Sequence, residues 1–196
     1  MTEPKIAIAY HSGYGHTKKQ AEAVADGARG AGAQVTLFAV DGGFDDWDAI
    51  NASDAIIFGS PTYMGGPSAQ FKAFADATSQ TVFAAGTLWK DKIAAGFTNS
   101  ASRAGDKSET LNQIVTFAAQ HGMHWVNLGL PPANNSSTGS ENDLNRLGFF
   151  KGAGAQSNAD EGPDVAPPSA DLQTAAHLGA RVAEVATIFL KGKSAA

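Results

Sequence analysis

The feature that most constrains the fold is a short apolar run that leads into a glycine-containing turn and then into an amphipathic segment. Residues 5–10, KIAIAY, are apolar enough for a buried parallel strand. The turn HSGYGHT follows at residues 11–17. Across residues 17–32 the apolar side chains recur at helical spacing, and Gly32 is placed to end a helix. A strand, a turn and a helix in this order begin a βαβ unit.

The same alternation continues along the chain. Further strands are predicted at residues 34–40, 55–59, 92–98 and 124–130, and further helices at residues 68–78, 109–120 and 169–190, with a short helix or turn at 45–53. Five strands alternating with helices predict a single α/β domain over residues 1–196, with a doubly wound, five-stranded parallel sheet covered by helices on both faces. Residues 131–168 are rich in Asn, Ser, Gly and Pro, which predicts a long loop that is functional or mobile.

Composition narrows the classes of function. The chain has 14 Lys and Arg against 19 Asp and Glu, and its formal net charge of −5 argues against a nucleic-acid-binding face. Cysteine is absent, which removes disulfides, thiolate nucleophiles and Cys-ligated metals. The histidines at 11, 16, 121 and 124 lack metal-ligand spacing with carboxylates. No signal peptide or transmembrane run is evident, so we expect a soluble, cytoplasmic protein.

The turn after the first strand is a predicted anion site. The N-terminus of a helix presents free backbone N–H groups, and its dipole favours negative charge. Gly13 and Gly15 allow the backbone to approach a phosphate closely, while Ser12 and Thr17 offer hydroxyl donors. A dinucleotide fingerprint would need a glycine where Lys18 stands, and the Walker pattern is missing. The loop therefore suits a monophosphate, and the alternative is an ordinary strand-to-helix turn.

Three segments together resemble one family. Residues 12–17, SGYGHT, resemble the FMN-phosphate loop of the flavodoxin-like NAD(P)H:quinone oxidoreductases of the WrbA-like group. Residues 59–65, GSPTYMG, resemble the group's G-[ST]-P-T-x-[FM]-G segment. Residues 120–123, QHGM, followed by GLP at 129–131, resemble its helix-ending H-G-M. The resemblance implies a flavodoxin-like fold, bound FMN, NAD(P)H as co-substrate, a quinone acceptor and a homodimer or homotetramer.

Two segments depart from the group's pattern. The connection between the second and third strands, residues 40–55, is shorter than is usual in the group. The loop after the fourth strand reads TNSASRAG at residues 98–105, where the group is typically rich in glycine. These departures bear on oligomer contacts and on the choice of nicotinamide cofactor more than on the FMN site.

The carboxyl ends of neighbouring parallel strands meet at one edge of a sheet, so three turns should lie together there. We expect the first to hold the FMN phosphate and the other two to contact the isoalloxazine ring. The proposed cofactor-binding residues are Ser12, Gly13, Tyr14, Gly15, His16 and Thr17, then Pro61, Thr62, Tyr63, Met64 and Gly65, and finally Asn99, Ser100, Ala101, Ser102 and Arg103. The alternative for each turn is a loop without a ligand.

Three side chains are candidates for more specific roles. Trp89 resembles the group's substrate-side tryptophan and would stack on a quinone or nicotinamide ring; a structural tryptophan is the alternative. His121 resembles a histidine near the flavin, and the alternative is a histidine interacting with a helix end. Arg103 would stabilise reduced flavin or bind a phosphate of NADPH, unless it is simply solvated.

The leading hypothesis for function is an enzyme in which NAD(P)H reduces bound FMN and a quinone then accepts two electrons at the same open face. Alternate binding at one face predicts ping-pong kinetics. One alternative is a flavodoxin-type one-electron carrier, for which a net charge of −5 is modest. Another is an interaction module that has lost the flavin.

Overall fold

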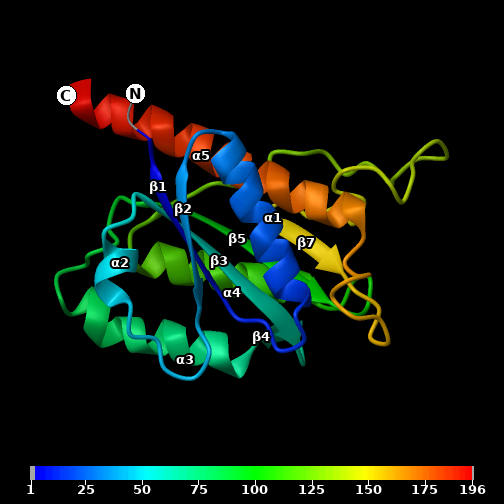
Figure 1. Cartoon of the computed structure of the whole chain (residues 1–196), viewed down its shortest axis with the longest axis horizontal. Helices are drawn as coiled ribbons and strands as arrows, with labels where there is room; N and C mark the ends of the chain where they lie inside the picture. Colours follow the sequence, from blue (N-terminus) through cyan, green and yellow to red (C-terminus); the bar gives the residue numbers. More distant parts are fainter. Residues whose placement is uncertain (1–2, 196) are drawn as a thin grey trace.

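Parallel strands form the centre of the computed structural model, which describes residues 3–195 (Figure 1). Their order in the sheet is β2-β1-β3-β5-β6. The bounds are Lys5–Tyr10 for β1, Gln34–Ala39 for β2, Ala55–Tyr63 for β3, Ile93–Ser100 for β5 and His124–Trp125 for β6. β1 and β3 are buried along almost their whole length because both faces of the sheet are covered, which explains their uninterrupted apolar sequences.

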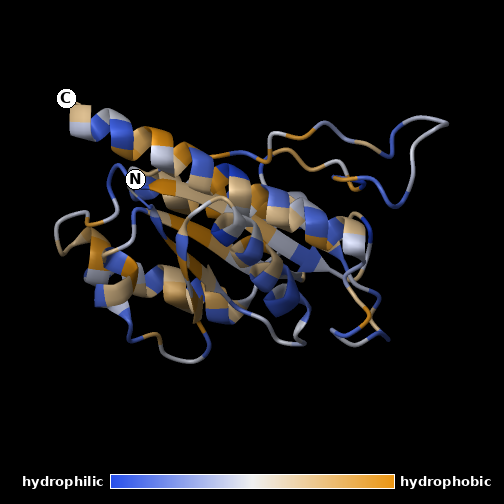
Figure 2. Ribbon diagram, turned by 45° about the horizontal axis from the view of Figure 1, so that its top comes forward, coloured by the Kyte–Doolittle hydropathy of each residue, from blue (hydrophilic) through white to orange (hydrophobic). Residues whose placement is uncertain are grey.

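Helices cover the two faces of the sheet in separate layers (Figure 1). α1 (His16–Gly30) and α5 (Ser169–Ala195) share a core with Ile6, Ile8 and Ile57 on one face. α2 (Trp47–Asn51), α3 (Ala69–Thr78) and α4 (Lys107–Gln120) pack on the other face, and a turn of π-helix, η1 (Ser79–Phe83), extends α3. Figure 2 shows largely apolar strands between helices in which hydrophilic and hydrophobic residues alternate. Flavodoxin-like α/β architecture is therefore confirmed.

Two glycines set the spacing of α1 and α5. A Cβ added to Gly27 would lie 1.8 Å from the carbonyl oxygen of Ala176, and one added to Gly179 would lie 1.9 Å from that of Val24. Contacts this short leave no room for any side chain, so the two helix backbones touch directly. Within residues 3–195, the helices lack the combination of length and continuous apolarity that a membrane span requires.

The prediction of five strands is wrong in its count, because the sheet described by residues 3–195 has seven. β4 (Gly66–Pro67) pairs antiparallel with the end of β3. The fifth position is divided between β6, which pairs with the start of β5, and β7 (Ala153–Gln156), which pairs with its end. Residues 126–152 leave the sheet between them, and part of this excursion is the yellow-green loop that projects from the body in Figure 1.

The local sequence explains why the fifth strand breaks. The predicted strand at 124–130 stops at Trp125, although Val126 N still donates to the carbonyl of Ala94. Gly129 then has φ +71°, outside the strand region, and Pro131 has no N–H to donate to a neighbouring strand. An apolar run alone could not distinguish this short strand from a longer one.

Candidate functional site

A cleft of about 510 Å³ opens at the carboxyl ends of β1, β3 and β5. Its size falls within the range of roughly 300–1,000 Å³ that is typical of small-molecule sites. Each of the three predicted turns contributes to the wall: Tyr14, His16 and Thr17 from the first, Pro61, Thr62 and Tyr63 from the second, and Asn99, Ser100 and Ala101 from the third. The structure thus brings together segments that are far apart in the sequence.

The glycines of the first turn let its backbone lie close to neighbouring segments of the chain. Gly15 has φ +88° and immediately precedes α1, and a Cβ added there would lie 2.9 Å from Pro163 Cγ. Ser12 Oγ accepts a hydrogen bond from Lys18 N at 3.0 Å, which fixes the turn and leaves the hydroxyl hydrogen free to be donated. A Cβ added to Gly13 would lie 2.6 Å from Tyr63 Oη, so the Tyr63 side chain of the second turn packs directly against the backbone of the first.

Buried hydroxyls hold the second turn in place. Thr62 Oγ1 lies 2.8 Å from Thr98 Oγ1 and donates to Thr110 Oγ1 at 2.8 Å, which joins β3 to β5 and α4. Beyond this point Met64 has φ +48° and is fully exposed, and neither it nor Gly65 lines the cleft. The cleft therefore uses the first half of the predicted turn.

The rim of the cleft is aromatic. The rings of Tyr14 and Tyr63 meet edge to face with 6.2 Å between centroids, and Tyr14 is 76% exposed. Burial raises the pKa of the Tyr63 phenol above its usual value of 10.0. The Tyr63 phenol therefore remains neutral at physiological pH. Both rings offer flat apolar surface beside the cleft.

A fourth wall was missing from the sequence prediction. Ser157, Ala159, Glu161 and Gly162 follow β7 and also line the cleft. Asn99 Nδ2 donates to Ser157 Oγ at 2.9 Å, and His16 Nε2 lies 2.8 Å from the carbonyl oxygen of Glu161. The segment was predicted only as part of a long loop. Its one sequence signal is the run of small residues AGAQS at 153–157, too short to be identified as a strand.

Trp89 does not line the cleft formed by this chain. Its side chain is fully buried, and Nε1 donates to Asn51 Oδ1 at 2.7 Å. Its ring packs against Phe58 at 5.8 Å between centroids. Trp89 precedes β5 and thus lies at the amino end of the strand, whereas the cleft is at the carboxyl end. The structural alternative is the correct one within this chain.

His121 is also remote from the cleft formed by this chain. It follows α4, just before β6 pairs with the first residue of β5 at the amino edge of the sheet. Nε2 lies 2.9 Å from Thr78 Oγ1, whereas Nδ1 is buried with no partner within residues 3–195. Burial lowers the pKa of His121 below 6.5, so the ring is neutral at physiological pH.

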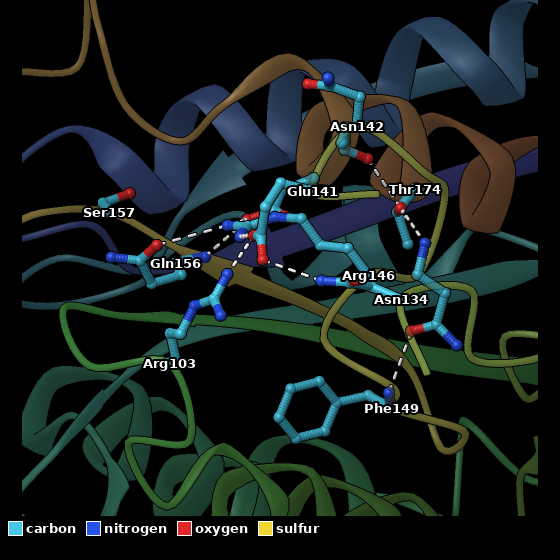
Figure 3. Close-up of polar contacts among 12 residues, drawn as sticks. Arg103, Asn134, Glu141, Asn142, Arg146, Phe149, Gln156, Ser157 and Thr174 are labelled. Carbon is cyan, nitrogen blue, oxygen red and sulfur yellow. Dashed lines mark hydrogen bonds and ion pairs between the residues drawn. The ribbon is translucent and has the colours of Figure 1, made fainter. Parts of the chain in front are cut away.

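Arg103 does not line the cleft. Its guanidinium forms an ion pair with Glu141 from the excursion between β6 and β7 (Figure 3). Hydrogen bonds from Arg103 and Arg146 lower the pKa of Glu141 to about 2. The Arg103 side chain is 60% exposed, so within this chain it is a solvent-facing arginine with an ion-pair partner.

Arg146 occupies the centre of this charged group. Nε and Nη2 donate to the two carboxylate oxygens of Asp171 at 2.7 and 2.9 Å, and Nη1 donates to Glu141 at 2.6 Å (Figure 3). The side chains of Arg146 and Asp171 are only 4% and 2% exposed. Asp171 also accepts from Gln156 N at 2.8 Å, so the pair links the excursion, α5 and the end of β7.

Comparison with known proteins gives consistent results. The family model for NADPH-dependent FMN reductase matches residues 47–136. Flavodoxin FldP of Pseudomonas aeruginosa is 46% identical over 185 residues, covering 92% of this chain and 96% of the relative. NAD(P)H dehydrogenase (quinone) of Archaeoglobus fulgidus is 34% identical over 210 residues, covering 93% and 97%. The crystal structure of a flavodoxin, WrbA-like protein from Agrobacterium tumefaciens matches with a TM-score of 0.72 and 43% identity, covering 95% and 99%.

Proposed function

Since this chain belongs to the WrbA-like family of NAD(P)H dehydrogenases (quinone), we propose that its cleft binds FMN and that the protein transfers two electrons from NAD(P)H to a quinone. The observation that carries the proposal is the meeting of a glycine turn, a helix N-terminus and three further loops around one cleft of about 510 Å³. Bound FMN supplies the electron chemistry, and the protein supplies binding and orientation.

The first turn fits a phosphate group. No hydrogen bond within residues 3–195 uses the backbone N–H of His16 or Thr17, which are therefore available at the start of α1. The hydroxyls of Ser12 and Thr17 add donors, and the glycine at position 15 lets the turn adopt φ +88° and pack closely against Pro163. We assign the phosphate to these residues.

The other walls fit a flat ring. Pro61 and Thr62 at the end of β3 line the cleft next to Asn99 and Ala101 at the end of the neighbouring β5, and Tyr63 also lines it. The tyrosine rings can stack on one face of the flavin, and the open side would admit NAD(P)H and the quinone in turn. Because both substrates would use the same opening, neither can bind until the other has left, which gives ping-pong kinetics.

Steady-state oxidation of NAD(P)H with benzoquinone and added FMN tests the proposal. Parallel lines in double-reciprocal plots at several quinone concentrations are expected, together with retention of stoichiometric FMN. A protein that neither retains FMN nor oxidises NAD(P)H in its presence would overturn it. Running NADH and NADPH side by side also determines which nucleotide is preferred.

A second candidate is a flavodoxin-type electron carrier, because the relative at 46% identity is named a flavodoxin. A carrier would hold FMN but would accept electrons from a reductase protein rather than directly from NAD(P)H. Direct hydride transfer, measured by mixing the FMN-loaded protein with NAD(P)H anaerobically, distinguishes the two. Fast flavin bleaching supports the enzyme, and bleaching only with an added reductase supports the carrier.

We further propose that residues 1–196 act as one FMN-binding domain, in the cytoplasm, as a homodimer or homotetramer. Neither Trp89 nor His121 reaches the cleft of its own chain, so their roles in the family's pattern need not follow here. Sedimentation equilibrium measures the subunit number directly. A monomer at all concentrations would exclude the oligomer.

A further inference from the structure

The loop after β5 has every carbonyl oxygen from residue 100 to residue 103 occupied by a donor. Two of these donors come from the segment around β7, and the others come from Lys107 and from within the loop. From the segment around β7, Ser157 N donates to Ser100 O at 3.1 Å and Gln156 Nε2 donates to Ala101 O at 2.9 Å. Within the loop, Ser100 Oγ donates to Ser102 O at 3.1 Å. Lys107 Nζ donates to Ser102 O at 2.7 Å and to Arg103 O at 2.9 Å.

The directions of these carbonyls fix the directions of the amide N–H groups that follow them. In a trans peptide the C=O of one residue and the N–H of the next point in opposite directions. The N–H groups of residues 101–104 therefore project away from the donors that hold the carbonyls. No hydrogen bond within residues 3–195 uses any of these four N–H groups, and Ala101 lines the cleft.

Lys107 is the charged member of this arrangement. It is the first residue of α4 and is completely buried, yet it forms no ion pair with a carboxylate within residues 3–195. Among the described residues, its ammonium donates hydrogen bonds to the two loop carbonyls alone. A buried ammonium without a bonded counter-ion is destabilising, and an apolar side chain would fill the same space without that cost. The ammonium must therefore be explained by its effect on the loop.

The surroundings of Lys107 define its charge state. Burial lowers its pKa to about 8, opposed by the negative charge of Asp171 and reinforced by the positive charge of Arg146. The ring of Phe149 lies 6.0 Å from Nζ. Lys107 is mostly protonated at neutral pH and loses its charge in mildly alkaline solution.

We propose that Lys107 is the positioning residue for the flavin-contacting loop. By holding the carbonyls of Ser102 and Arg103, it fixes the course of the loop that begins with Ser100 and Ala101, which line the cleft, and so keeps the free N–H of Ala101 available as a donor for the electron-rich carbonyl edge of a flavin ring. The positive end of that peptide dipole then faces the ligand. This inference rests on the proposed binding of FMN, and it assigns the loop's effect to the ring rather than to the phosphate.

Titration of the apoprotein with FMN and with riboflavin tests this assignment. Lys107→Met should weaken binding of both ligands by about tenfold or more, as expected when a charge-assisted hydrogen bond is lost. Lys107→Arg, which keeps charge and donors, should recover a large part of the affinity. Lys72→Met is the matched control, because Lys72 is exposed and pairs only with Asp76 on α3.

The pH dependence gives a second readout that does not require a Met variant to fold. Riboflavin affinity of the wild-type protein should fall as pH rises through about 8, whereas that of Lys107→Arg should stay constant. A folded Lys107→Met protein with wild-type affinity, or a wild-type affinity that is constant through this region, would overturn the role of Lys107. Failure of the wild-type protein to bind FMN at any pH would instead overturn the proposed function.

Discussion

Replacement of Arg146 by methionine should destabilise the fold more than any surface substitution. The change removes both hydrogen bonds to Asp171, at 2.7 and 2.9 Å. It leaves a carboxylate that is 2% exposed and whose one remaining donor in the described part of the chain is the backbone N–H of Gln156. Removing one partner of a buried ion pair costs about 3–5 kcal/mol, because the other charge stays buried without compensation. The lost contact with Glu141 adds little, because that carboxylate is exposed to solvent.

Thermal and urea unfolding measure this cost. A domain of this size loses about 2–4 °C in Tm per kcal/mol, so the expected decrease is roughly 6–20 °C. The double variant Arg146→Met/Asp171→Leu should recover most of the loss, because both buried charges are then gone. Arg29→Met is the control, since Arg29 forms an exposed pair with Asp26 and should change stability by less than about 0.5 kcal/mol. A double variant that loses the sum of the two single effects would refute the coupling.

Three further substitutions test separate parts of the structure. Gly15→Asp should weaken the binding of FMN more than that of riboflavin, because a carboxylate repels phosphate. Gly15→Ala, which adds only a Cβ, should weaken the binding of both ligands equally in calorimetric titrations. Trp89→Phe should lower unfolding stability by about 1–3 kcal/mol through the unpaired Asn51 amide while FMN affinity stays constant, and a selective loss of quinone turnover would contradict this. Burial lowers the pKa of His121 below 6.5, so the unfolded chain binds more protons and stability should fall as pH drops below 6.5. His121→Gln should flatten that part of the urea-unfolding profile, and an unchanged slope would show that another group is responsible.

The parts of the site that could be predicted from the sequence depend on local rules. Gly15 at a positive φ before a helix and Pro61 at the end of an apolar strand have signatures within a few residues of themselves. The wall that contains Ser157 could not be predicted in this way. Its position follows from pairing of β7 with the end of β5, across a long excursion whose own sequence has no strand-like period.

The positions of Trp89 and His121 relative to the cleft could not be predicted for a different reason. A resemblance in sequence gives a residue's position along the chain but not the end of the sheet at which it lies within one subunit. Trp89 lies at the amino edge because it comes before β5, and His121 lies there because it follows α4, which runs antiparallel to the strands. Tracing the direction of each element would have separated them from the turns at the carboxyl edge.

The direct backbone contact at Gly27 and Gly179 has a consequence for how the protein is made. During translation, residues 3–168 emerge from the ribosome before α5, so the apolar surfaces of α1 and of Ile6 and Ile8 initially have no cover on that side. Contacts between such distant parts of a chain form slowly, and exposed apolar surface in the interval favours aggregation or capture by chaperones. Because a Cβ at either glycine would collide with the opposite backbone, the last helix has one way to dock. A nascent chain arrested before residue 169 should therefore bind chaperones, whereas a chain that includes α5 should be released from them.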